Sequence, residues 1–264
     1  ICLAVFLFFV TISDSQGEFA VPGDYITLRE HIVEKYSKTK PKVFSQWVPG
    51  VKTKIDTAGK IAVITLDACG GKKGSGYDLE LITFLRENKI PAALFMTGLW
   101  IDANPAIVKE LAADPLFEIE NHGMYHKPAS VNGSVIYNRR GTKNAGELVD
   151  EIELNAVKIE KITGRRPLFY RPGTAYFDDV AVKIVYDLKH IPMNFSVVSG
   201  DAAGFKPERI AKRILSGTKN GSVIIGHMNM PGKNLCPALK KSLLILKERG
   251  YRFVKLEDYK NSLK

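Results

Sequence analysis

The feature that most constrains the fold is a regular alternation of short apolar runs with amphipathic segments between residues 60 and 254. The first run, Ile61–Leu66, is apolar or β-branched throughout, which is typical of a strand buried on both faces. The segment that follows carries an apolar stripe of Leu79, Ile82 and Leu85 at helical spacing. We predict strands at residues 61–66, 91–97, 116–120, 167–171, 193–198, 222–225 and 252–254, and helices at residues 78–88, 104–113, 147–162, 178–188, 207–215 and 236–249.

Strands that alternate with helices are typical of parallel βαβ units, which fit either a closed barrel or an open doubly wound sheet. Polar side chains follow five of the predicted strands, and a barrel gathers such strand ends into one mouth, whereas an open sheet would spread them along an edge. We therefore predict an α/β fold: a single domain with a distorted, TIM-like (β/α)7 barrel. The polar residues at the strand ends are Asp67, His122, His126, Arg171, Asp201 and His227.

The histidines His122 and His126 are four residues apart and follow the third predicted strand. If the chain turns helical there, both imidazoles fall on one face and can share a metal ion. The spacing alone is weakly specific, since a solvated loop pair has the same pattern. Each of the other polar residues also has an ordinary structural alternative: a helix cap for Asp67, a surface ion pair for Arg171 and a hydrogen-bonded core histidine for His227.

Taken together and in order, the motifs at these strand ends resemble the polysaccharide deacetylases, carbohydrate esterase family 4 or the NodB-homology domain, over about residues 60–256. One motif of this kind is weak, whereas five on successive strand ends are specific. They read Thr65-Leu66-Asp67-Ala68, His122-Gly123-Met124-Tyr125-His126, Arg171-Pro172-Gly173, a segment centred on Asp201, and Gly226-His227-Met228-Asn229.

The resemblance implies a hydrolase acting on non-peptide carbon–nitrogen bonds, which removes acetyl groups from the N-acetylated sugars of a peptidoglycan- or chitin-like polysaccharide. It also implies a divalent metal, usually zinc. The implied roles are Asp67 as base, His122 and His126 as metal ligands, Arg171 as the group that orients the base, His227 as general acid, Asp201 as its orienting carboxylate, and the backbone N–H of Thr174 as oxyanion donor. Tyr176 and Trp100 are candidates for lining a sugar groove, although Trp100 suits the core equally well.

This sequence departs from the family pattern at residue 68. The family usually carries two adjacent aspartates in its first motif, the second being a metal ligand, and here that position is Ala68, followed by Cys69-Gly70-Gly71. Three arrangements remain open. Asp67 moves onto the metal and another group serves as base; Cys69 ligates as a thiolate, which suits zinc; or the site binds metal weakly or not at all.

Two other functions fit the same motifs. One is an O-acetyl esterase of the acetyl-xylan type, which would use the same carboxylate and histidines on an ester. The other is a carbohydrate-binding pseudoenzyme that has lost its metal together with the second aspartate.

The chain carries a net charge of +10 and has a pI of 9.4. Such a charge suits either solubility or attraction to an anionic matrix such as a cell-wall polymer. Lys and Arg are spread along the chain with no basic block and no zinc-finger or RNA-recognition pattern, so we expect no nucleic-acid partner.

Of the three cysteines, Cys69 and Cys236 can pair in an oxidising compartment, and the alternative for Cys69 is a small packed residue. The third, Cys2, lies in the N-terminal segment described next. We expect His31 and His190 to lie on the surface.

Residues 1–10 form an uninterrupted apolar run that is too short to span a bilayer. With the polar residues after it, this run resembles part of a secretory signal over residues 1–17; a buried strand or a retained anchor is the alternative. We expect a lead-in at residues 18–59, with a helix at 25–36, packed on a deacetylase domain at residues 60–264. The expected location is therefore secreted, periplasmic or at the cell envelope, with no stable membrane span after signal removal.

Overall fold

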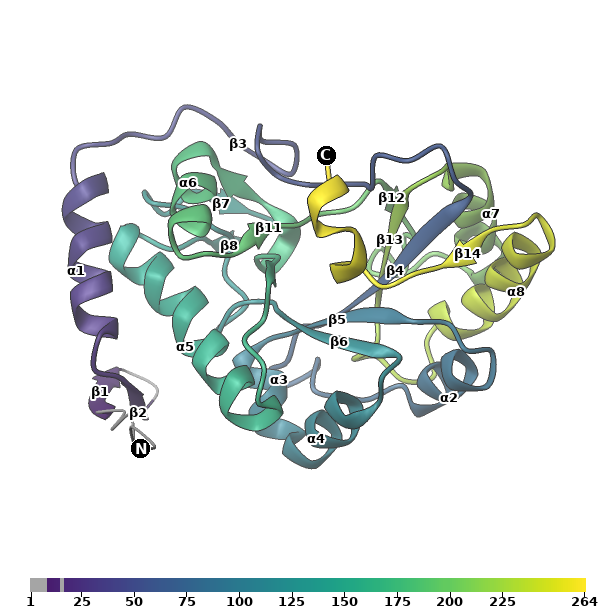
Figure 1. The fold of residues 1–264 in the computed structure, drawn as a ribbon, viewed down its shortest axis with the longest axis horizontal. Coiled ribbons are helices and arrows are strands. Elements are labelled where there is room, and N and C mark those ends of the chain that lie inside the picture. The colour runs from purple at the N-terminus through teal and green to yellow at the C-terminus, as the bar shows by residue number, and fades with distance from the viewer. Residues whose placement is uncertain (1–8, 15–16) are drawn as a thin grey trace, which may run out of the picture.

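The computed structural model describes residues 9–14 and 17–264 and shows a curled parallel β-sheet surrounded by helices (Figure 1). Its strands run in the order β11-β9-β6-β5-β4-β13-β12, and β14 pairs with the start of β4. They are β4 (Ile61–Ala68), β5 (Ala92–Met96), β6 (Phe117–Asn121), β9 (Phe169–Tyr170), β11 (Ile191–Pro192), β12 (Val197–Val198), β13 (Ser222–His227) and β14 (Arg252–Phe253). The prediction of an α/β domain built on a distorted barrel is confirmed, in the form of a half-barrel.

The predicted helices are confirmed to within two residues at each end. The structure adds one helix that the sequence analysis missed, α3, which begins where the Thr97 hydroxyl accepts a hydrogen bond from the Trp100 N–H at 3.1 Å. The helices are α1 (Tyr25–Tyr36), α2 (Leu79–Glu87), α3 (Gly98–Ala103), α4 (Pro105–Ala113), α5 (Ala145–Thr163), α6 (Asp179–Asp187), α7 (Pro207–Gly217) and α8 (Leu235–Glu248).

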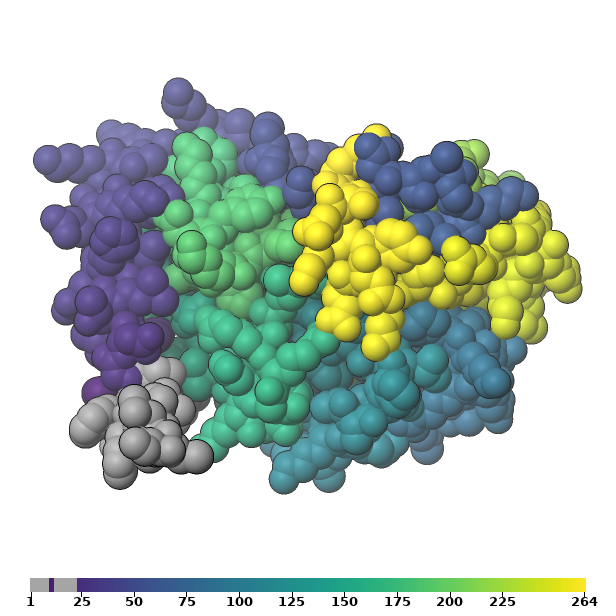
Figure 2. All heavy atoms as spheres, in the orientation of Figure 1, coloured from purple at the N-terminus to yellow at the C-terminus, as the bar shows by residue number. Residues whose placement is uncertain are grey.

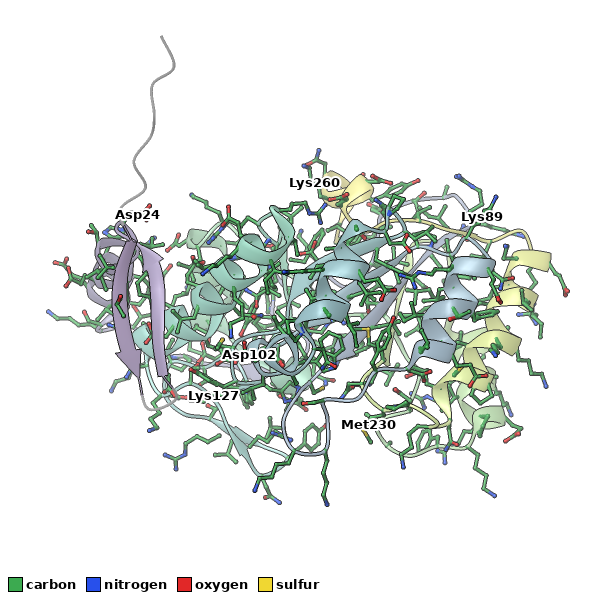
Figure 3. The ribbon with its side chains drawn as sticks, turned by 90° about the horizontal axis from the view of Figure 1, so that it is seen from below. Asp24, Lys89, Asp102, Lys127, Met230 and Lys260 are labelled. Atoms are coloured by element: carbon green, nitrogen blue, oxygen red, sulfur yellow. The ribbon has the colours of Figure 1, made fainter. Side chains whose placement is uncertain are left out.

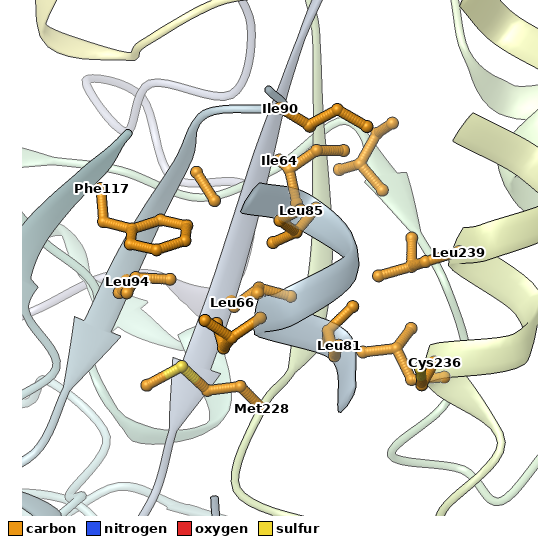
Figure 4. Packing of buried hydrophobic residues seen from close by; sticks show 14 of the residues in the cluster. Ile64, Leu66, Leu81, Leu85, Ile90, Leu94, Phe117, Met228, Cys236 and Leu239 are labelled. Carbon is orange, nitrogen blue, oxygen red and sulfur yellow. The ribbon is translucent and has the colours of Figure 1, made fainter. Parts of the chain in front are cut away.

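The central strand β4 is buried on both faces, as its continuous apolar sequence predicts. Ile64 and Leu66 pack outward against the helices; Figure 4 shows them beside Leu81 and Leu85 of α2. Because successive strand residues point to opposite faces, the odd-numbered residues of β4 point into the barrel, where Ile61 and Val63 join the inner core cluster. This alternation aims Asp67 into the barrel mouth.

The predicted strand at 193–198 is wrong in detail, because only Val197–Val198 of it forms a strand, β12, which pairs with β13. The strand at the other edge of the sheet, β11, precedes the predicted range and pairs with β9, and residues 193–196 between β11 and β12 belong to neither strand. The carbonyls of Met193 and Asn194 instead accept hydrogen bonds from the Arg171 side chain, each at 3.1 Å. Residues 52–55 run across the gap: the Lys52 N–H donates to Pro192 at 2.8 Å and the Ile55 N–H donates to Gly221 at 2.8 Å.

The N-terminal region forms a hairpin and a helix ahead of the barrel. β1 (Phe9–Asp14) pairs antiparallel with β2 (Gly17–Pro22), and the remainder of the predicted signal, residues 1–8 and 15–16, lies outside the described residues. α1 packs against α5, with Arg29 paired to Asp150 at 2.7 Å. No helix in the described ranges is long and apolar enough to cross a membrane.

Two further segments close the barrel surface. β3 (Phe44–Ser45) pairs antiparallel with β10 (Phe177–Asp178). At the C-terminus, Leu263 bridges Ile55, and Figure 2 shows these C-terminal residues, in yellow, lying against the blue segment around residue 50. Residues 130–146 contain a short hairpin, β7 (Val135–Ile136) with β8 (Arg139–Arg140).

The loops that follow the carboxyl ends of the strands lie along one side of the molecule. In Figure 3, Lys127, after β6, and Met230, after β13, lie on the lower side. Lys89, which precedes β5, and Lys260, in the C-terminal 3-10 helix η2 (Glu257–Ser262), lie on the upper side. The strand-end residues predicted from the sequence therefore share the lower side, as a barrel mouth requires.

Two histidines outside the motifs differ in burial. His31 is exposed, as expected. The expectation that His190 lies on the surface is wrong, since it is buried and its Nε2 lies 3.3 Å from a carboxylate oxygen of Glu153 on α5. The turn after α6 folds His190 back onto α5, a long-range contact that the local polar sequence does not reveal.

Cys69 and Cys236 are both free, so the pairing considered from the sequence is absent. Cys236 lies in the core between α8 and α2, where Figure 4 shows it near Leu81, and burial raises the pKa of its thiol to about 11. Cys69 lies at the carboxyl end of β4, half-buried in the barrel mouth.

Candidate active site

A buried ion pair between Asp67 and Arg171 forms the floor of the barrel mouth. Arg171 Nη1 donates to Asp67 Oδ1 at 2.6 Å, and the two side chains are 0% and 4% exposed. Burial alone would raise the pKa of Asp67, but the Arg171 and His122 charges hold it below its usual value. Asp67 is therefore a carboxylate at neutral pH, with Oδ1 occupied by Arg171.

Arg171 is held on every side. Besides Asp67 and the carbonyls of Met193 and Asn194, its Nη1 donates to the Thr65 hydroxyl at 3.1 Å. Its guanidinium lies over the Phe95 ring, 4.1 Å from the centroid. With this many fixed partners, the guanidinium of Arg171 is held rigidly beside Asp67.

His122 is buried, and its hydrogen bonds define which nitrogen faces the mouth. Nδ1 lies 2.7 Å from the Arg171 carbonyl oxygen, which can only accept, so Nδ1 carries the proton. Nε2 then faces Asp67 Oδ2, 3.6 Å away, and Cys69 Sγ, 3.9 Å away. A histidine held in this way through one nitrogen presents the other as a metal ligand.

His126 completes the pair, but not on a helix as the spacing suggested. Residues 122–126 form a loop in which Gly123 and His126 both adopt positive φ, +83° and +61°. The two imidazole rings meet edge to face with centroids 4.9 Å apart. The loop geometry thus brings together the two rings that a helical turn was expected to align.

Glu151 of α5, which the sequence analysis missed, holds this loop in place. Its carboxylate accepts hydrogen bonds from the backbone N–H groups of Tyr125 and Lys127, each at 3.0 Å. A Cβ at Gly123 would lie 2.4 Å from Glu151 Oε1, so only glycine fits there. Burial raises the pKa of Glu151 to about 7. An acidic residue on the apolar side of a predicted helix was the available signal.

Cys69 joins the two histidines at the mouth. One ligand atom from each of Cys69, His122 and His126 lies within 4.8 Å of the others. Burial opposes ionisation of the thiol, but His126, His122 and His227 together bring the pKa of Cys69 well below its ordinary value. A thiolate with two imidazoles is a donor set that suits zinc, so these residues fit the divalent metal that the motifs imply.

His227 and Asp201 form a second charged pair across the mouth. His227 lies beside Asp67 in the register of β13 with β4. Its Nδ1 is 3.1 Å from Asp201 Oδ2, which also accepts from the His227 backbone N–H at 3.0 Å. Burial opposes the charge, but Asp201 raises the pKa of His227 well above its ordinary value. Ser199 donates to Asp201 at 2.6 Å and fixes its orientation.

Thr174 and Tyr176 follow Arg171 at the rim of the mouth. Thr174 has a φ of +69°, and its carbonyl accepts from Gln46 Nε2 at 3.1 Å. The Tyr176 ring packs between the rings of Phe44 and Tyr137, the latter from the β7–β8 hairpin. The ring centroids lie 5.3 Å and 5.9 Å from that of Tyr176, respectively. Tyr137 is 69% exposed. Trp100 is fully buried, so of its two alternatives the core is the observed one.

The comparisons with known proteins agree with the motifs. Residues 54–191, more than half of the chain, match the sequence family described as polysaccharide deacetylase. A peptidoglycan-N-acetylglucosamine deacetylase of Bacillus cereus is 26% identical over 202 residues, which are 75% of this chain and 87% of that protein. The peptidoglycan-N-acetylmuramic acid deacetylase PdaA of Bacillus subtilis is 23% identical over 70% of this chain and 66% of its own length.

Solved structures show the same fold at low identity. A family 4 pseudoenzyme from Bacillus anthracis superposes with a TM-score of 0.68 at 18% identity, covering 94% of this chain and 88% of that one. A family 4 acetyl xylan esterase from Clostridium thermocellum, in complex with a cobalt ion, superposes with a TM-score of 0.62 at 21% identity. The match covers 76% of this chain and 90% of that one. By its sequence match and its fold, the chain belongs to the polysaccharide deacetylase family.

Proposed function

We propose that this chain is a metal-dependent hydrolase that removes acetyl groups from the N-acetylated sugars of a peptidoglycan- or chitin-like polysaccharide. The observation that carries the proposal is the placement of two charged pairs, Asp67–Arg171 and His227–Asp201, beside the His122–His126 pair. The names of the deacetylase relatives support the substrate class and an action at the cell envelope or outside the cell.

In the proposed reaction, His122 and His126 would hold a divalent metal, for which zinc is the best fit to the imidazole donors. When bound, such an ion would supply Lewis-acid chemistry toward the acetyl carbonyl and the attacking water. Asp67 accepts a proton from the attacking water through Oδ2, because Arg171 occupies Oδ1. The Thr174 backbone N–H is the proposed donor to the developing oxyanion.

His227 is the proposed general acid for the departing amine. Asp201 keeps its imidazole protonated and aims Nε2 into the mouth, since Nδ1 is engaged by the carboxylate. Asp67 and His227 lie at neighbouring positions of adjacent strands, so a proton acceptor and a proton donor face the same space. This division of roles follows from opposite shifts: the pKa of Asp67 is lowered and the pKa of His227 is raised.

The Asp201→Asn substitution should move the alkaline limb of the pH–rate profile to lower pH. The Asp201 carboxylate raises the pKa of His227, so the acid stays protonated to higher pH; without that charge it loses its proton earlier. We expect a loss of at least about tenfold at pH 8, measured as kcat/KM for acetate release. Asp258→Asn, an exposed carboxylate outside the mouth, is the control. An unchanged alkaline limb in Asp201→Asn would exclude His227 as the acid.

The exposed aromatic rim supports contact with a sugar chain. Tyr137→Ala should raise KM for long oligomers by about 3- to 10-fold with little change in kcat, because stacking by one ring contributes about 0.5–1.5 kcal/mol. Leu244→Ala, an exposed apolar residue of α8, should leave both constants unchanged. A fall in kcat at constant KM would instead place Tyr137 in the chemical step.

A substrate panel separates the proposed activity from its two alternatives. We expect acetate release from N-acetylglucosamine oligomers when zinc or cobalt is supplied, and none after chelation. Cleavage of acetylated xylan alone would identify an O-acetyl esterase. Glycan binding without bound metal and without acetate release would identify a pseudoenzyme, the class named for the Bacillus anthracis protein that has the same fold.

A further inference from the structure

We propose that Cys69 is the third protein ligand of the metal, in place of the aspartate that the family usually supplies. The inference rests on the proposed function, because it assigns a ligand to the metal of that same site. Asp67 then stays paired with Arg171 and keeps its role as base. Of the three arrangements left open by the sequence, the geometry points to this one.

The first argument is distance. Cys69 Sγ lies 3.9 Å from His122 Nε2, and a ligand atom of His126 falls within 4.8 Å of both. In a tetrahedral zinc site with bonds of about 2.3 Å to sulfur and about 2.0 Å to nitrogen, neighbouring sulfur and nitrogen ligands are about 3.5 Å apart. The observed pair therefore needs to close by only a few tenths of an ångström.

The second argument is the alternation of side chains along β4. Thr65 and Asp67 point into the barrel, where both contact Arg171. Ala68 is fully buried on the opposite face, in the core cluster with Leu66 and the surrounding helices, where an uncharged methyl group fits. Cys69 is the next residue whose side chain reaches the mouth, so the third metal ligand would come from residue 69 and not from residue 68.

The third argument is that the backbone around Cys69 is fixed. The Cys69 carbonyl accepts a hydrogen bond from the Thr97 hydroxyl at 2.9 Å. Gly70 has a φ of +75°, and a Cβ there would lie 2.7 Å from the Trp100 nitrogen. The sequence Cys69-Gly70-Gly71 therefore makes a tight turn that holds the thiol beside His122, as a preorganised ligand requires.

The fourth argument concerns Asp67 as the rival ligand. Its Oδ2 lies 3.6 Å from His122 Nε2, but its Oδ1 is held by a fully buried guanidinium. Moving the carboxylate onto the metal would loosen that pair, and Asp67 is the only carboxylate that pairs with Arg171 among the described residues. Cys69 reaches the same histidine without disturbing any ion pair of the described chain.

Cobalt titration of the chelated protein tests the inference without relying on activity. A thiolate ligand gives an intense near-ultraviolet sulfur-to-cobalt charge-transfer band, which imidazole and carboxylate ligands do not give. We expect this band in the wild type and in Cys236→Ala, a matched removal of the buried core thiol. We expect no band in Cys69→Ala, together with a loss of cobalt affinity of about 100-fold or more.

Cys69→Asp keeps the test decisive if the alanine variant folds poorly. It should bind cobalt more tightly than Cys69→Ala but show no charge-transfer band, since it returns an oxygen ligand to the site. Cobalt bound at one equivalent by the wild type without the band would overturn the inference, and so would an unchanged affinity in a folded Cys69→Ala.

The cobalt experiment and the acetate-release assay can fail independently, so failure of the cysteine ligand is distinguishable from failure of the proposed function. Acetate release without the charge-transfer band would leave the deacetylase proposal standing and refute the cysteine ligand. The band without acetate release from any glycan would support the cysteine ligand and refute the deacetylase proposal.

Discussion

Replacing Asp67 by asparagine should lower the rate of acetate release by about 10²- to 10⁴-fold, the usual contribution of a general base. The amide keeps the size of the side chain but cannot accept a proton near neutral pH. Because Cys69 and the two histidines remain, metal content should stay at the wild-type level. The measurement is kcat/KM on N-acetylglucosamine oligomers, with metal content determined on the same samples.

The control for this substitution is Asp258→Asn, which should keep full activity, since this exposed carboxylate lies outside the mouth. Loss of bound metal in Asp67→Asn would show that Asp67 is itself a ligand. Retention of activity within tenfold of wild type would rule out Asp67 as the base.

Replacing Arg171 by methionine should destabilise the protein by about 3–5 kcal/mol, the range for breaking a buried ion pair from one side. The substitution leaves Asp67 as a buried carboxylate without its main partner and frees the carbonyls of Met193 and Asn194. Since typical domains are stable by only about 5–15 kcal/mol, the loss should be visible as a large drop in the urea midpoint.

The pH dependence of this effect has a defined sign. The pKa of Asp67 is lowered in the folded state, so its contribution to stability is present above its unfolded pKa of about 3.9 and is lost as pH falls through the folded value. The wild type and Arg171→Met should therefore differ most near neutral pH and converge in acid. Arg139→Met, an exposed arginine of β8, is the matched control and should not shift the midpoint. A loss of less than about 1 kcal/mol in the free energy of unfolding of Arg171→Met would contradict a structural role for the Asp67–Arg171 pair.

The parts of the fold that depend on local sequence were predictable. The β-branched run in β4 and the apolar stripe of α2 predicted their elements because burial on both faces, or on one, leaves a periodic signature. α3 was missed because it is short and begins at a glycine. A Cβ at Gly98 would lie 2.1 Å from Met124 Sδ, so a contact from a distant loop selects that residue.

The interruption at residues 193–196, between β11 and β12, was unpredictable for a similar reason. Its sequence has the apolar character of a strand, but two of its carbonyls turn inward to Arg171. This rearrangement depends on a charged residue from another strand, which no local pattern reveals. The burial of His190 against Glu153 is likewise a contact between distant elements.

In the mouth, motif order predicted which polar residues meet, because parallel strands bring their carboxyl ends to one side. It did not predict the supports: Thr65 and Asn194 around Arg171, or Glu151 beneath the His126 loop. These residues act through hydrogen bonds to side chains and backbone groups far away in sequence. The proximity of Cys69 to His122 was only one of three alternatives until the geometry was known.

The most direct test of the proposed function is mass analysis of N-acetylglucosamine oligomers after incubation with chelated protein reloaded with one equivalent of zinc. We predict loss of acetyl groups from the oligomers, with one acetate released for each free amine formed. The chelated protein should leave the oligomers unchanged, and zinc-loaded Asp67→Asn should release acetate at least about 100-fold more slowly. Unchanged oligomers, from folded protein shown to contain the metal, would contradict the assignment of this chain as an N-deacetylase.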